Sequence, residues 1–130
     1  MTPAERFGSA PVARLATVGA DGAPHLVPIV FALVGETIHS AVDAKPKRHR
    51  GLQRLANIAA EPRVSVLVDH YADDWTALWW VRADGIAVVR ESSAAGLEAL
   101  TAKYAQYRET PPPGPFVEIS VRRWTAWGVS

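Results

Sequence analysis

Alternation of apolar and polar residues is the main signal along this chain, and it predicts strands. Residues 63–71 read RVSVLVDHY, with Val64, Val66 and Val68 on one face. Similar extended runs cover residues 11–18, 25–34, 37–42, 78–91 and 116–130, separated by turn residues such as GADG. Asp84-Gly85 interrupts the run over residues 78–91, so we expect a turn or bulge there. About six strands joined by turns predict a mainly β fold, with an antiparallel sheet curled into a barrel.

Only a few segments have a helical pattern. Thr2 is expected to cap a short helix that begins at Pro3. A second helix is expected from about residue 46 to residue 60, and a third follows Ser92 or Ser93. The apolar stripe of the second helix comprises Leu52, Leu55, Ala56 and Ala59, and that of the third comprises Leu97, Leu100, Tyr104 and Tyr107. At 130 residues, the chain is expected to form a single domain over residues 1–130.

Positive charge is concentrated in residues 44–58, AKPKRHRGLQRLANI. On a helix, Lys47, Arg50, Arg54 and Asn57 would lie opposite the apolar stripe at spacings of three and four, so one anion could contact several of them. Arg48 falls in the first turn, where free N–H groups favour an anion such as phosphate. The alternative is an ordinary solvated basic face.

Composition narrows the choice of function. The net charge of +1 argues against a nucleic-acid binder, and the absence of cysteine excludes disulfides and thiolate chemistry. The four histidines lack the spacing of a helical metal site, so no metal is expected. No nucleophile–base pair, GxGxxG motif or phosphate-binding P-loop is present. Without a signal sequence or a run long enough to span a bilayer, we expect a cytoplasmic protein with no membrane contact.

The five tryptophans are the other unusual feature. Core packing is the ordinary interpretation of each one, because a tryptophan buries a large area. Trp79 and Trp80 are neighbours on a strand and should face opposite sides, and Trp124 and Trp127 form a second group. One small barrel interior cannot hold all of them, so at least one should line an interface or a groove for an aromatic ligand.

Taken together, the basic helix, the EPRVSVLVDHY strand and the WWVRADG strand resemble the pyridoxamine 5'-phosphate oxidase-like split-barrel flavoproteins. The chain looks most like their actinobacterial branch, which uses the deazaflavin coenzyme F420. The likeness extends from PVARLATVGADGAPHLVPIVF to the terminal VRRWTAW. It implies a six-stranded antiparallel split barrel of the FMN-binding type. It also implies a homodimer with two cofactors in grooves at the dimer interface.

The resemblance also implies which residues form the site. Candidates for the cofactor phosphate and acidic tail are Lys45, Lys47, Arg48, Arg54 and Asn57. The cofactor ring would lie against Pro28, Ile29 and Val30 and the backbone of Ser40, Ala41 and Val42. Trp79 is a further cofactor-binding candidate. It would form apolar walls together with Trp127 from the partner chain, which is the candidate for the substrate pocket. Which of Lys47, Arg48, Arg50 and Arg54 hold the phosphate stays open.

The function implied by the resemblance is an F420-dependent oxidoreductase. A reduced deazaflavin gives up a hydride from C5, so the protein need only hold the ring and an electron-poor small molecule face to face. No catalytic protein residue is identified. Two alternatives stay open: an FMN-dependent enzyme of the pyridoxamine-phosphate oxidase type, and a non-catalytic F420-binding protein.

Overall fold

The computed structural model describes residues 1–42 and 48–128, with side chains for all of these except residues 48–52. The elements in chain order are α1 (Pro3–Gly8), β1 (Ala13–Val18), β2 (Pro24–Ile29), β3 (Ala32–Val34), β4 (Thr37–Ala41), α2 (Arg48–Ala60), β5 (Arg63–His70), the 3-10 helix η1 (Trp75–Ala77), β6 (Trp79–Arg90), α3 (Ala94–Lys103), α4 (Ala105–Glu109) and β7 (Phe116–Trp127). The expected mainly β fold with few helices is confirmed.

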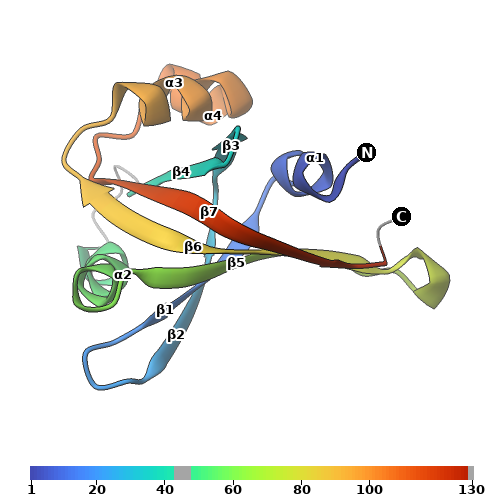
Figure 1. The fold of residues 1–130 in the computed structure, drawn as a ribbon. Coiled ribbons are helices and arrows are strands. Elements are labelled where there is room, and N and C mark those ends of the chain that lie inside the picture. Colours follow the sequence, from blue (N-terminus) through green and yellow to red (C-terminus); the bar gives the residue numbers. More distant parts are fainter. Residues whose placement is uncertain (43–47, 129–130) are drawn as a thin grey trace.

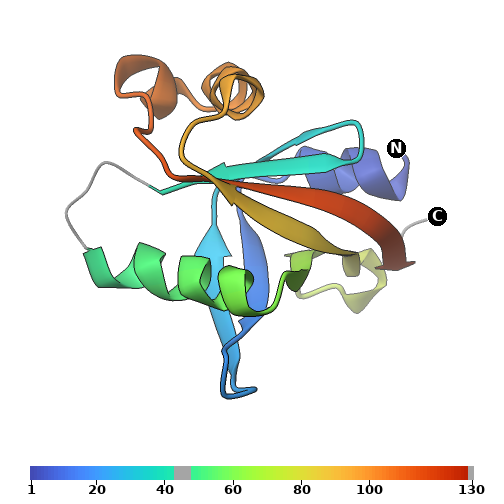
Figure 2. The same cartoon turned by 60° about the vertical axis from the view of Figure 1, so that its left-hand side comes forward.

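One curled antiparallel sheet runs in the order β2-β1-β5-β6-β7-β4-β3. Its inner face holds the main core, which includes Leu15, Phe31, Ile38, Val66 and Ile119. Figures 1 and 2 show α3 and α4 on one side of β4 and β7 and α2 on the other. α2 packs on β1 and β6, whereas α3 packs on β3 and β4. The side of β2-β1-β5-β6-β7 that points away from the main core is called the outer face below.

The strand count is seven and not the expected six, because the run over residues 25–34 breaks. β2 ends at Ile29 and β3 begins at Ala32. At the break, the Phe31 N–H and carbonyl bond the Tyr104 hydroxyl, at 3.1 and 2.8 Å, in place of a neighbouring strand. The expected single late helix is also wrong, since α3 and α4 are separated by Tyr104 in an extended conformation.

Other local predictions are confirmed. The Thr2 hydroxyl accepts a hydrogen bond from the Glu5 N–H, and the Glu5 carboxylate accepts one from the Thr2 N–H, which is a capping box. The register of β6 against β7 shifts between Asp84 and Gly85. Here a Cβ on Gly85 would collide with the Ser120 carbonyl, so glycine is required for the close approach of the two strands.

The predicted apolar stripe of α2 is wrong in part. Ala56 and Ala59 are exposed, whereas Asn57 and Ile58 are buried. The Asn57 amide donates to the Thr17 hydroxyl at 3.0 Å and its oxygen accepts from the Gln53 side chain at 2.8 Å. Asn57 can lie on the buried face of α2 because the polar atoms of its side chain are hydrogen-bonded. The pattern had instead predicted that Ala56 and Ala59 would lie on that face.

Candidate functional site

The ends of β2 and β4 meet at the place where the cofactor ring was expected. We call the two segments Pro28–Val30 and Ser40–Val42 the seam. The Ser40 hydroxyl donates to the Val30 carbonyl at 2.8 Å and joins them. β2 is a terminal strand of the sheet, and β3 pairs with β4 only as far as His39. The facing edges at the seam are therefore unpaired in the sheet, which is where a ligand can approach the backbone.

The predicted phosphate-binding residues follow the seam in the chain. The Val42 N–H donates to the Pro115 carbonyl at 3.0 Å, and α2 begins at Arg48. Lys45 and Lys47 lie outside the described residues, and so does the side chain of Arg48. Arg54 is half-buried on α2. Asn57, expected among the cations, instead lies on the buried face of α2 with both ends of its amide hydrogen-bonded.

Trp79 and Trp127 line one pocket at the far end of β6 and β7. This aromatic pocket encloses about 270 Å³ and is lined by Asp69, His70, Tyr71, Leu78, Trp79, Trp80 and Trp127. The Trp79 ring stacks on the His70 ring, with 5.9 Å between the ring centres. The Arg6 guanidinium lies 5.1 Å from the centre of the Trp79 ring. No seam residue lines this pocket. Within one chain, the structure therefore does not bring the tryptophan walls to the seam.

Trp79 and Trp80 face opposite sides of the sheet, as predicted. Trp79 packs against the main core, whereas Trp80 pairs with Trp127 across β6 and β7 and has the Arg82 guanidinium 5.8 Å from its ring centre. Trp80 also lines a groove on the outer face of about 610 Å³, together with Arg14, Ala16, Leu26, Ser65, Leu67, Asp69 and Arg82. The exposed fractions of Leu26 and Trp127 are 67% and 53%.

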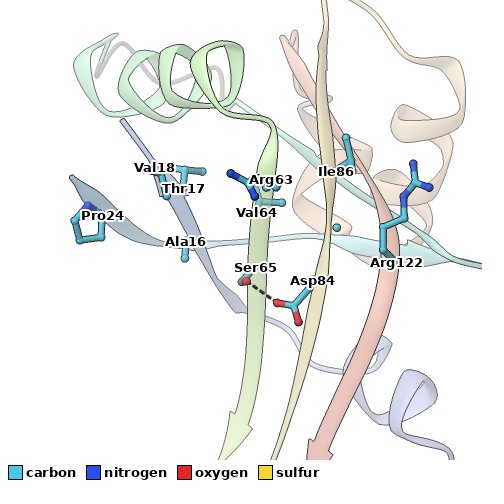
Figure 3. Close-up of a pocket in the computed structure, with 11 residues that line it drawn as sticks. Ala16, Thr17, Val18, Pro24, Arg63, Val64, Ser65, Asp84, Ile86 and Arg122 are labelled. Carbon is cyan, nitrogen blue, oxygen red and sulfur yellow. Dashed lines mark hydrogen bonds between the residues drawn. The ribbon is translucent and has the colours of Figure 1, made fainter. Parts of the chain in front are cut away.

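A second outer-face groove of about 400 Å³ adjoins the first (Figure 3). Asp84 is central to it: its carboxylate accepts from the Ser65 hydroxyl at 2.6 Å and lies 3.3 Å from Arg82 and 3.5 Å from Arg123. Burial would raise the pKa of Asp84, but the Ser65 hydroxyl and the two guanidinium groups hold it below its usual value. This network around Asp84 was not predicted from the sequence. The only feature of the sequence that indicates this network is the presence of polar residues at alternate positions of the strands.

His39, next to the seam residue Ser40, is buried beneath the start of α3. Its Nδ1 atom has no hydrogen-bond partner among the described residues and lies 3.9 Å from the Glu118 carboxylate. Glu118 also accepts from the Ser93 hydroxyl at 2.8 Å and pairs with Arg90. Burial lowers the pKa of His39, although Glu118 opposes this, so His39 is neutral at pH 7.

Within the described ranges, no group of three or more histidine, aspartate or glutamate side chains is arranged to hold a metal ion. Among the helices that the structure describes, none has both the length and the apolar character needed to cross a membrane.

Comparison with known proteins shows the same architecture elsewhere. Residues 4–128 match the sequence model of a family described as pyridoxamine 5'-phosphate oxidase. A search of curated protein sequences finds no match.

Solved structures extend the comparison. An FAD-binding protein from Mesorhizobium loti is 21% identical with a TM-score of 0.69, and the alignment covers 95% of this chain and 89% of that one. The heme storage protein HutZ from Vibrio cholerae is 15% identical with a TM-score of 0.70, over 96% and 92% of the two chains. A conserved hypothetical protein from Mycobacterium tuberculosis is 26% identical with a TM-score of 0.67, over 98% and 84%. The expected split-barrel fold is thereby confirmed.

Proposed function

The chain belongs to the pyridoxamine 5'-phosphate oxidase family, and on that premise we propose that it is a deazaflavin (coenzyme F420)-dependent oxidoreductase. The FAD-binding proteins among the similar structures support a flavin-type cofactor. The reaction proposed is hydride transfer from the reduced cofactor to an electron-poor or conjugated small molecule. The cytoplasm remains the expected location.

The observation that carries the proposal is an unpaired backbone seam followed, after Asp43, by a cation-rich segment. Residues 44–60 contain Lys45, Lys47, Arg48, Arg50 and Arg54 and no aspartate or glutamate. One phosphate monoester needs fewer cations than this. A phosphodiester that continues into a polyglutamate tail presents several negative charges in a row, which matches the charge of this segment.

The seam fits the planar ring of the same cofactor. Ile29, Ser40 and Ala41 are buried and packed within the sheet, and Val30 and Val42 are half-buried at its edge. No hydrogen bond among the described residues uses the Val30 N–H, which leaves a donor for a polar ring edge. When bound and reduced, the cofactor supplies the hydride. The chain's residues then hold the two reactants in contact and exclude water.

We propose that the active unit is a homodimer formed through the outer face. Leu26 and Trp80 provide apolar area there, and charged groups of both signs surround them. In a dimer with two-fold symmetry such a face pairs with itself, so positive groups can meet negative ones. The dimer would also bring Trp127 of the partner subunit to the seam, which one chain alone does not achieve. The substrate would then lie between aromatic walls.

A titration of the purified protein with oxidised deazaflavin, followed by fluorescence, tests the proposal. Lys47→Ala and Arg48→Ala should each weaken deazaflavin binding about tenfold, because a hydrogen bond to a charged group is lost. Arg108→Ala is the matched control: the Arg108 guanidinium bonds the Thr101 carbonyl of α3 at 2.8 Å, a contact in which no seam residue takes part. Equal weakening by all three variants, or by none, would contradict the assignment of the cation segment.

A flavin mononucleotide enzyme is the second candidate. It is favoured by the similar structures of proteins described as FAD-binding, because FAD is a flavin and not a deazaflavin. Binding of flavin mononucleotide in preference to deazaflavin would move the protein to that branch. Tight deazaflavin binding without reduction of any acceptor would instead indicate a non-catalytic carrier. The heme storage protein of the same fold makes hemin a necessary third probe in the titration.

A further inference from the structure

Two side chains from the end of α3 hold the break between β2 and β3. The Lys103 ammonium donates to the Phe31 carbonyl at 2.8 Å and to the Ala10 carbonyl at 2.7 Å. The Tyr104 hydroxyl accepts from the Phe31 N–H at 3.1 Å. The same hydroxyl oxygen lies 2.8 Å from the Phe31 carbonyl oxygen and 2.9 Å from the Pro11 carbonyl oxygen, and donates its one proton to this pair. We call these contacts the Lys103–Tyr104 clamp.

The environment of Lys103 is unusual for a surface lysine. Its ammonium lies 3.8 Å from the centre of the Phe31 ring and 5.3 Å from that of Tyr104. Among the described residues no carboxylate lies within 4 Å of it. Burial lowers the pKa of Lys103 to about 8, so the group is still charged at pH 7. Its hydrogen bonds to the two carbonyls are therefore charge-assisted.

The clamp acts on Phe31, the residue that directly follows the seam segment Pro28–Val30. Phe31 is fully buried, and its ring packs on Phe7 at 5.1 Å. Its backbone N–H and carbonyl are both bonded by the clamp. On the other side of the break, the Val30 carbonyl is bonded by Ser40. The Val30 carbonyl and the Phe31 N–H belong to the same peptide, so Ser40 and the clamp together fix the plane of the Val30–Phe31 peptide at the end of the seam.

The extended conformation of Tyr104 is explained by the same contacts. Tyr104 has φ and ψ of −115° and 120°, which are not helical. α3 therefore ends at Lys103, and α4 starts at Ala105. A continuous helix would project Tyr104 along the helix surface. The break in the helix instead lets its hydroxyl reach the break in the strand, where it bonds the backbone N–H and carbonyl of Phe31 that no neighbouring strand satisfies.

We infer that Lys103 and Tyr104 are positioning residues for the cofactor, because they fix the Val30–Phe31 backbone at the edge where the ring binds. This inference rests on the proposed function. It assigns the α3–α4 hairpin a role in cofactor orientation and not only in covering the sheet.

Three variants test the inference: Lys103→Met, Lys103→Arg and Tyr104→Phe, with Arg108→Gln as the control. Arg108 is a cation of the same hairpin. Among the described residues, its guanidinium donates hydrogen bonds to the Thr101 and Ala102 carbonyls of α3. The first measurement is hydrogen exchange of the Phe31 amide without cofactor. The second is the affinity for oxidised deazaflavin, together with the position of its absorption band when bound.

Lys103→Met and Tyr104→Phe should speed exchange at Phe31 and weaken deazaflavin binding about tenfold each, with a shift of the absorption band. Lys103→Arg should restore most of both properties, because a guanidinium also donates to carbonyls. Arg108→Gln should change neither. Rescue by arginine and a shifted band would not arise from a general loss of stability.

Unchanged exchange at Phe31 in Lys103→Met and Tyr104→Phe would overturn the clamp. Faster exchange with unaltered affinity and an unaltered band would overturn the positioning role. Failure of the unaltered protein to bind deazaflavin would overturn the proposed function and the positioning role with it, while the exchange measurement would still decide on the clamp.

Discussion

Asn57 and Thr17 form a buried polar contact between α2 and β1 whose energy can be measured. Asn57→Ala removes the donor to the Thr17 hydroxyl and leaves that hydroxyl buried, with an exposed fraction of 1%, and without its partner. We expect a loss of about 2 kcal/mol in the free energy of unfolding, measured by urea denaturation. The double variant with Thr17→Val should cost less than the sum of the single changes. Additive effects would show that the contact contributes nothing.

His39 should make the stability of the protein sensitive to mild acid. Its pKa is lowered in the folded chain, so below its ordinary value of 6.5 the unfolded chain binds the additional proton more readily. The free energy of unfolding should therefore fall as the pH decreases from 6.5 towards 5. The charged groups nearest to His39 are Glu118 on β7 and, through it, Arg90 on β6.

His39→Gln separates this effect from that of other groups. Glu118 has a lowered pKa, so its contribution is lost only below about pH 4.5 and does not overlap the His39 window. Urea denaturation at pH 7 and pH 5.5 should show a smaller difference for His39→Gln than for the unaltered protein. An equal difference would rule out His39 as the source.

At the level of elements, Gly85 allows the close approach of β6 and β7. Gly85→Ala should lower the free energy of unfolding by roughly 1–3 kcal/mol, because its Cβ meets the Ser120 carbonyl and the Ile119 side chain. Gly8→Ala is the control, since a Cβ there makes only ordinary contact with Leu33 at 3.4 Å. Equal stability of Gly85→Ala and the unaltered protein would show that the bulge can shift.

The elements predicted from the sequence depended on local pattern, and so did the errors. Alternation is a property of each strand alone, which is why β1, β4, β5 and β7 lie where the pattern placed them. The breaks at Val30–Phe31 and at Tyr104 arise from one contact between residues 73 positions apart. No local pattern carries such a contact. In the same way, the burial of Asn57 depends on Thr17, which lies 40 positions away.

The candidate site was predictable to a different extent in its two halves. The resemblance named the two segments of the seam, and the structure joins them through the hydrogen bond from Ser40 to Val30, while their role in binding a cofactor stays a prediction. Trp79 and Trp127 of one chain line a pocket without seam residues, so the predicted walls depend on a second copy of the chain, whose placement no local sequence pattern encodes. The clamp was missed, since Lys103 and Tyr104 read as ordinary residues of an amphipathic helix.

At the scale of the whole molecule, the outer face should be buried between two copies. Leu26→Glu places a charge in the exposed apolar part of this face and should convert a dimer into a monomer in light scattering coupled to size exclusion. Val34→Glu is the control, because Val34 is similarly exposed but lies on β3. A monomeric unaltered protein, or a dimer that Leu26→Glu leaves intact, would contradict the proposed interface.

The identity of the cofactor is the central claim, and parallel titrations of the unaltered protein with oxidised deazaflavin and flavin mononucleotide test it most directly. Residues 44–60 are rich in cations and contain no acid. We therefore expect a lower dissociation constant for deazaflavin than for flavin mononucleotide, by about tenfold for each additional tail charge that the protein binds. That difference should shrink as salt concentration rises. Equal affinity for the two compounds, or tighter binding of flavin mononucleotide, would contradict the account.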